Sequence, residues 1–179
     1  MAPSVAEPPA PGRLTDQDWQ VSNATTTLPE RAILTDAPPE RRTFSVPLDA
    51  GEFVVEVFGD PPGWIEPTIR SLGDLLRLPP DWDSYGGAPV DPRCVAAALN
   101  FALETLGDQT PAPAVVPTSR GGIQFEWHTR GIDMEIEFVS PTRIYSLFED
   151  SATGTSWERD VSSDLHPLTA AISKLSPRR

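Results

Sequence analysis

The chain of 179 residues carries a formal net charge of -12 and one cysteine, Cys94. That charge excludes a broad electrostatic surface for nucleic acid or anionic lipid, because binding phosphates needs a basic face. One cysteine excludes an internal disulfide, and no stretch resembles a signal peptide or is long and apolar enough to span a bilayer. We therefore expect a cytoplasmic protein that contacts neither membrane nor nucleic acid directly.

The prolines are the main guide to domain organisation. The chain has 21 prolines and is 39% hydrophobic, which is too many prolines and too few apolar residues for one packed body. Residues 1–42 combine repeated prolines with few apolar residues at any regular spacing, and this predicts a disordered N-terminal arm. We expect residues 43–176 to form a single domain.

The first predicted elements are a β-hairpin and a helix. Apolar residues alternate with polar ones over residues 44–48 and again over 53–57, on either side of a turn at 49–51. From Trp64 to Arg77 the apolar residues recur at helical spacing, and Pro79-Pro80 ends that helix.

A second helix is predicted from Pro92 to Leu106, with Asp91 as its N-cap. Its apolar residues form two faces rather than one stripe, which is typical of a helix buried on both sides. It is therefore either the central helix of the fold or a subunit contact. Because the arm looks too polar to cover the second face, we favour a homodimer in which Phe101 lies at the contact.

The rest of the chain predicts strands followed by one helix. The strands are expected at residues 115–116, 123–128, 132–139 and 143–148 and around Trp157, and Asp164 is expected to cap the last helix. Strands that neighbour each other in sequence form an antiparallel meander. The fold class is therefore α+β, in the order hairpin, two helices, meander, helix.

The meander predicts a cluster of carboxylates. If Thr129-Arg130 is a two-residue turn, the apolar residues of both strands share one face and Glu126 lies opposite Asp133. The other face then gathers Gln124, Glu126, Asp133, Glu135 and Glu137. This face is either simply solvated or neutralised by Arg143 or Arg120, or it binds a divalent cation or a basic partner.

The loop at residues 78–89 is the second candidate surface. It places Trp82 and Tyr85 among glycine, proline and aspartate, and Asp83 can cap a turn through its side chain. The two aromatic residues either plug the end of the core or form an interaction platform.

Two motifs of this region resemble a known family. One is Trp82-Asp83-Ser84-Tyr85-Gly86 before the alanine-rich helix, and the other is Gly121-Gly122-Ile123-Gln124-Phe125-Glu126-Trp127 before an alternating strand. Together they resemble a family of small uncharacterised bacterial proteins, over residues 70–175. The resemblance implies a recurrent domain of bacteria or their phages and no established activity.

No catalytic pattern stands out in the sequence. Neither Gly-Gly pair has a nucleotide-binding context, Ser84 lacks a nucleophile elbow, and Cys94 lies in an apolar helix. We therefore expect a non-enzymatic protein-binding module, an accessory or antitoxin-like protein without cofactor or metal. Its expected partner is a protein, with basic character if it docks on the carboxylates. The partner-binding residues predicted are Trp82, Asp83, Tyr85, Glu126, Asp133 and Glu135.

Two alternatives stay open. One is a divalent-metal-dependent hydrolase that uses Glu126, Asp133 and Glu135, and the other is an acidic mimic of nucleic acid. Enzymatic activity is thus undecided from the sequence, which favours a binding role.

Overall fold

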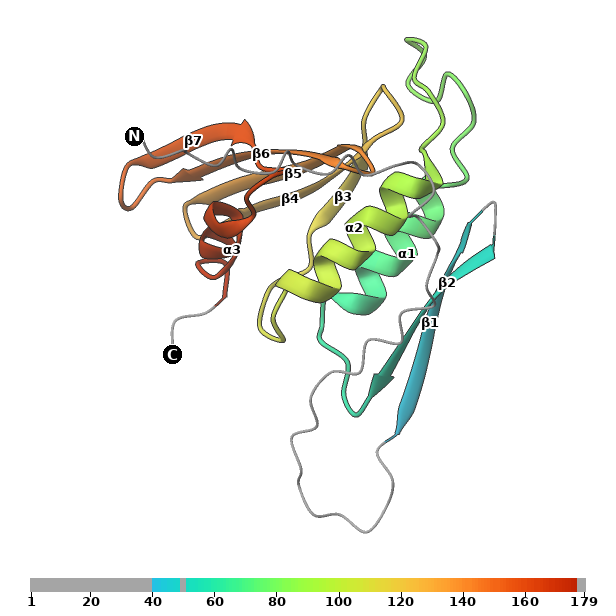
Figure 1. Cartoon of the computed structure of the whole chain (residues 1–179), viewed down its shortest axis with the longest axis horizontal. Coiled ribbons are helices and arrows are strands. Elements are labelled where there is room, and N and C mark those ends of the chain that lie inside the picture. The colour runs from blue at the N-terminus through green and yellow to red at the C-terminus, as the bar shows by residue number, and fades with distance from the viewer. Residues whose placement is uncertain (1–39, 49–50, 177–179) are drawn as a thin grey trace, which may run out of the picture.

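The computed structural model describes residues 40–48 and 51–176. The protein is an α+β fold, as predicted. A two-stranded hairpin, a pair of helices and a five-stranded antiparallel sheet form successive layers (Figure 1). In chain order the elements are β1 (Arg41–Leu48), β2 (Gly51–Phe58), α1 (Ile65–Leu75), α2 (Pro92–Thr105), β3 (Ala114–Pro117), β4 (Ile123–Thr129), β5 (Ile132–Ser140), β6 (Arg143–Asp150), β7 (Thr155–Asp160) and α3 (His166–Ile172).

The hairpin formed by β1 and β2 covers α1. The register places Phe44 opposite Val55 and Val46 opposite Phe53, so alternate apolar residues face the helix. The strand already includes Arg41 and Arg42, at the end of the predicted arm. The rest of that arm, residues 1–39, and most of the predicted turn, residues 49–50, lie outside the described residues.

The helix α2 is central, because both of its apolar faces are covered. One face packs on β4 and β5, and α1 lies beside it, between α2 and the hairpin (Figure 1). Phe101 is 5% exposed, and its ring meets that of Phe138 edge-on at 5.5 Å between centroids. The prediction that Phe101 lies at a subunit contact therefore loses its basis, since this side chain is already buried within one chain.

The local ends of α2 follow the sequence. Asp91 Oδ1 accepts a hydrogen bond of 2.8 Å from the Arg93 N–H, and Pro92 occupies the first turn, where its missing N–H is not needed. α3 differs from the prediction, because its N-cap is Leu165, which makes no side-chain capping bond, and not Asp164. Asp164 lies one residue further back, where its Oδ1 accepts a hydrogen bond of 2.9 Å from the His166 N–H.

The sheet runs in the order β3-β4-β5-β6-β7, and its register corrects one prediction. The turn between β4 and β5 is Arg130-Gly131, with φ of 53° and 76°, and not Thr129-Arg130. A two-residue turn in which both residues have positive φ favours glycine at its second position. The shift is two residues, so each side chain keeps its predicted face while its partner changes. Glu126 lies opposite Glu135 rather than Asp133.

α3 lies on the same side of the large sheet as α2 (Figure 1). Leu168 and Ile172 are buried there, and two polar contacts add to the packing. Lys174 Nζ lies 2.9 Å from Asp150 Oδ2, and Arg130 Nη1 donates to the Leu175 carbonyl at 3.2 Å. Among the described residues, no helix combines the length and apolar character needed to cross a membrane.

Candidate functional site: the loop cluster and the acidic sheet face

The loop between α1 and α2 is held by its own aspartates. Asp83 Oδ1 accepts hydrogen bonds of 2.8 Å from the backbone N–H groups of both Tyr85 and Gly87, and Asp81 Oδ1 accepts one of 2.7 Å from Gly86. The Tyr85 N–H, followed by that of Gly87, holds the pKa of Asp83 below its usual value, because both favour the carboxylate. Asp83 therefore remains an anion that ties the tip of the loop to its base.

The same loop contains unusual backbone geometry. Asp81 and Ser84 both have φ of 62°, a region that residues other than glycine rarely adopt. A Cβ added at Gly87 would lie 2.8 Å from Trp82 Nε1 and 2.9 Å from Asp83 Cγ. Conformations of this kind persist only where the surroundings over-determine them, and they concentrate at functional sites.

A second loop supports the first from the side. The Ala88 N–H donates to the Ser119 carbonyl at 2.9 Å, and the Asp91 N–H donates to the Gly121 carbonyl at 2.8 Å. The two backbones are so close that a Cβ at Gly121 would lie 2.8 Å from the Pro89 oxygen. We call residues 81–89 and 118–122 together the loop cluster.

The two aromatic residues of the loop have different roles. Trp82 is half-buried and donates its Nε1–H to the Ala88 carbonyl at 3.1 Å, so it fixes the loop from inside. Tyr85 is 93% exposed and projects from the tip. The structure thus separates the two residues, because Trp82 lies half-buried within the loop and Tyr85 is exposed at its tip.

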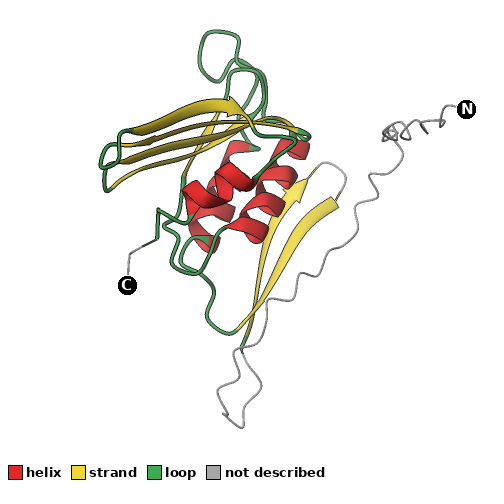
Figure 2. Ribbon diagram, turned by 60° about the vertical axis from the view of Figure 1, so that its left-hand side comes forward, coloured by secondary structure: helices red, strands yellow, loops and turns green. Residues whose placement is uncertain are grey.

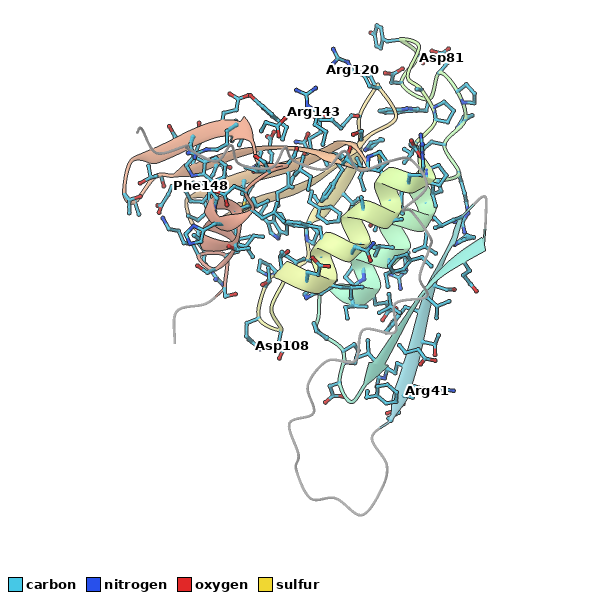
Figure 3. The ribbon with its side chains drawn as sticks, in the orientation of Figure 1. Arg41, Asp81, Asp108, Arg120, Arg143 and Phe148 are labelled. Carbon is cyan, nitrogen blue, oxygen red and sulfur yellow. The ribbon has the colours of Figure 1, made fainter. Side chains whose placement is uncertain are left out.

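Arg120 is the residue of this region that the sequence analysis did not place in a binding site. It is exposed in the second loop and forms no ion pair with the residues that the structure describes (Figure 3). In a chain with a net charge of -12, an exposed guanidinium in the loop beside that of Tyr85 is a distinctive local feature. The sequence feature that could have identified Arg120 is its position in a turn, directly before Gly121-Gly122.

The outer face of the large sheet, turned away from the helices, is acidic. From the register, its carboxylates come from β4 to β7, and we call these residues the acidic sheet face: Glu126, Asp133, Glu135, Glu137, Glu149, Glu158 and Asp160. The last three were not predicted, although they occupy alternate positions of their strands.

The negative charges of this face are offset in part, each by a group close to it. His128 Nδ1 lies 2.7 Å from Asp133 Oδ1, and the hydrogen bond to Asp133 raises the pKa of His128. Gln124 Nε2 donates to Glu126 Oε1 at 3.1 Å, while Glu126 and Glu135 remain a directly opposed pair of like charges. Of the two cations expected to neutralise the face, Arg143 pairs with Asp160 at 3.1 Å, a carboxylate of this face that was not predicted. The other, Arg120, forms no ion pair with these carboxylates.

The geometry gives no support to a metal centre or a cysteine nucleophile. Within residues 40–48 and 51–176, no three histidine, cysteine, aspartate or glutamate side chains are grouped to hold a metal ion. The set proposed for a hydrolase, Glu126, Asp133 and Glu135, is therefore no ligand group. Cys94 is 1% exposed, and burial raises the pKa of its thiol to about 11, so it is a core residue in the thiol form at neutral pH.

The loop cluster and the acidic sheet face lie on the same side of the molecule. In both orientations the loops rise beyond one end of the sheet, on the side away from α2 and α3 (Figures 1 and 2). A partner of ordinary size can therefore contact both.

Comparisons with known proteins found no relative of this chain. No family model, no curated protein and no solved structure matches it. The resemblance carried by the Trp82-Asp83-Ser84-Tyr85-Gly86 motif accordingly stays a prediction.

Proposed function

We propose that this protein is a non-enzymatic, cytoplasmic protein-binding module of the accessory or antitoxin-like kind. Its partner docks on the loop cluster, with Tyr85 as the central contact and Trp82 and Asp83 as residues that hold the loop. The observation that carries the proposal is the 93% exposure of Tyr85 at the tip of a loop fixed by its own hydrogen bonds.

The physical reason is that such a contact costs little conformational entropy when it forms. Tyrosine offers a large ring and a hydroxyl with few rotatable bonds, and tyrosine and arginine are enriched among the residues that dominate interface energies. A loop that is already held in one conformation loses little further entropy on binding. Tyr85 and Arg120 fit this description, because Tyr85 is presented on such a loop and Arg120, in the neighbouring loop, forms no ion pair with the described residues.

The acidic sheet face also selects the partner by its charge. Glu126, Asp133 and Glu135 lie among further carboxylates with few cations, which favours a partner with a basic surface. Exposed charges of this kind raise the association rate and exclude acidic competitors more than they strengthen the final complex. The complex should therefore associate more slowly as salt is added.

The test is recovery of the partner by the native protein and its Tyr85 variants from an extract of the producing cells. The native protein should retain one stoichiometric partner, Tyr85→Ala should lose it, and Tyr85→Phe should keep most of it. Asp108→Ala is the matched control, because Asp108 is exposed at the opposite end of the molecule from Asp81 (Figure 3). Equal recovery by the native protein and Tyr85→Ala, or no partner with either, contradicts the proposal.

One observation favours a second candidate, an acidic mimic of nucleic acid. The seven carboxylates of the acidic sheet face gather on one side of four adjacent strands. Such a face can occupy the nucleic-acid site of a basic protein. Competition decides between the two: added nucleic acid displaces a mimic from its target and leaves a complex made through Tyr85 intact.

A further inference from the structure

Within residues 40–48 and 51–176 the two sheets end on four edge strands, and one of these edges is less protected than the others. Free backbone N–H and C=O groups on an edge invite another strand, so proteins usually block them with prolines, charges or shortness. β1 contains Arg41, Arg42 and Pro47. β3 is short and ends at Pro117, and β7 carries Glu158, Arg159 and Asp160.

The edge of β2 is the least protected of the four, because its only charges are two glutamates, Glu52 and Glu56, and it is neither short nor interrupted by proline. Its sequence, Gly-Glu-Phe-Val-Val-Glu-Val-Phe, contains no proline and no basic residue, and it pairs with β1 along all 8 residues without a bulge. Within the described part of the chain, nothing pairs with its other side. Two of the large apolar side chains most exposed to solvent, Val54 (44%) and Phe58 (51%), lie on its outer face.

We propose that the free edge of β2 pairs with β2 of a second copy, antiparallel about a twofold axis. Two sheets of two strands then become one sheet of four. This surface is separate from the loop cluster, so the inference does not depend on the proposed function.

The choice of a second copy rests on the pairing that the sequence of β2 permits with itself. A twofold register centred on Val55 places Val54 opposite Glu56 and Phe58 opposite Glu52, and each side chain keeps its face. Centring on Val54 would instead oppose Glu52 and Glu56, and centring on Glu56 would oppose that residue to itself. Registers centred on Phe53 or Val57 also avoid like-charge pairs but pair fewer residues of the strand. Of the two longest registers, centred on Val54 and Val55, the one on Val55 is free of like-charge pairs, and it pairs the strand from Glu52 to Phe58.

This register predicts opposite effects for two substitutions at one exposed position. Val54→Glu sets a carboxylate against Glu56 of the second copy, twice in each dimer because of the symmetry. Val54→Lys sets an ammonium against the same carboxylate and removes the same apolar group. Ser45→Glu is the matched control, because Ser45 is exposed on β1 directly opposite Val54, one strand away from the proposed seam.

The experiment is sedimentation equilibrium of the full chain and these variants, with circular dichroism to show that each is folded. We expect the native chain, Val54→Lys and Ser45→Glu to be dimers, and the dissociation constant of Val54→Glu to rise by roughly tenfold or more. Added salt should leave the native dimer as strong or strengthen it, since two chains of charge -12 repel.

Three results overturn the inference. A monomeric native chain does so. If the β2 amides that point away from β1 are then protected from exchange, residues 1–39 occupy the edge. A dimer that all three variants leave unchanged uses another surface. If Val54→Glu and Val54→Lys lose the dimer equally, the proposed register is wrong.

Discussion

Replacement of Phe101 by alanine tests whether α2 is the centre of the fold. The Phe101 ring is 5% exposed and lies 5.5 Å from that of Phe138, which in turn lies 5.4 Å from Phe125. Truncating a buried phenylalanine costs about 3–5 kcal/mol through lost burial and the cavity left behind. For a domain of this size that corresponds to a fall in the melting temperature of roughly 10–20 °C.

The assay is thermal unfolding of native protein and Phe101→Ala at equal concentrations, followed by circular dichroism, with light scattering for the oligomeric state. Tyr85→Ala is a useful comparison, because that ring is 93% exposed and its loss should change the melting temperature far less. If Phe101→Ala melts with the native protein but dissociates a dimer, Phe101 lies at a subunit contact and the account of α2 is wrong.

Three further outcomes follow from the geometry of single residues. Gly87→Ala should displace the loop around Tyr85 and speed hydrogen exchange of its amides, whereas Gly63→Ala, where nothing lies within 4 Å of an added Cβ, should leave them unchanged. The hydrogen bond from Lys174 lowers the pKa of Asp150 from 3.8 to about 2, so this carboxylate adds stability above pH 3.8 that is lost as the pH falls through 2. The stability difference between native protein and Asp150→Asn should therefore shrink over that range in acid unfolding curves. An NMR titration should place the pKa of His128 above 6.5, and Asp133→Asn should bring it back towards that value, since Asp133 is the main cause of the rise.

The elements of the fold could be predicted because local rules and tertiary packing agree. Alternation marked the strands, and Asp91 with Pro92 marked the start of α2. The two apolar faces of α2 were also visible. What covers each face depends on residues distant in the sequence, such as Phe138, and periodicity alone does not pair them. The prediction of a homodimer through Phe101 assumed that the second face of α2 is uncovered, and that face is covered within one chain.

The register of the β4–β5 hairpin shows a different limit. Placing the apolar residues on one face is a test that two registers pass when they differ by two residues. Only the turn distinguishes these two registers. Gly131, with its positive φ at the second turn position, favours the observed register, and the prediction from the sequence did not take it into account. The consequence reached the candidate site, because Glu126 gained Glu135 as its partner and Asp133 gained His128.

The candidate site was predicted in part. The loop at Trp82–Tyr85 was recognised from its composition, but only the structure separates the half-buried Trp82 from the exposed Tyr85, since accessibility depends on the Ala88 carbonyl that Trp82 reaches. Arg120 was overlooked as a contact because its nearness to this loop arises from hydrogen bonds between residues 88 and 119 and between 91 and 121.

Site-specific photocrosslinking in the producing cell tests the central claim most directly. A benzoylphenylalanine placed at position 85 keeps an aromatic side chain at the exposed tip, and the same group at position 108 serves as the control at the far end of the molecule. The account predicts one covalent adduct of defined mass from position 85 and none from position 108. No adduct from position 85, or the same set of adducts from both positions, would contradict it.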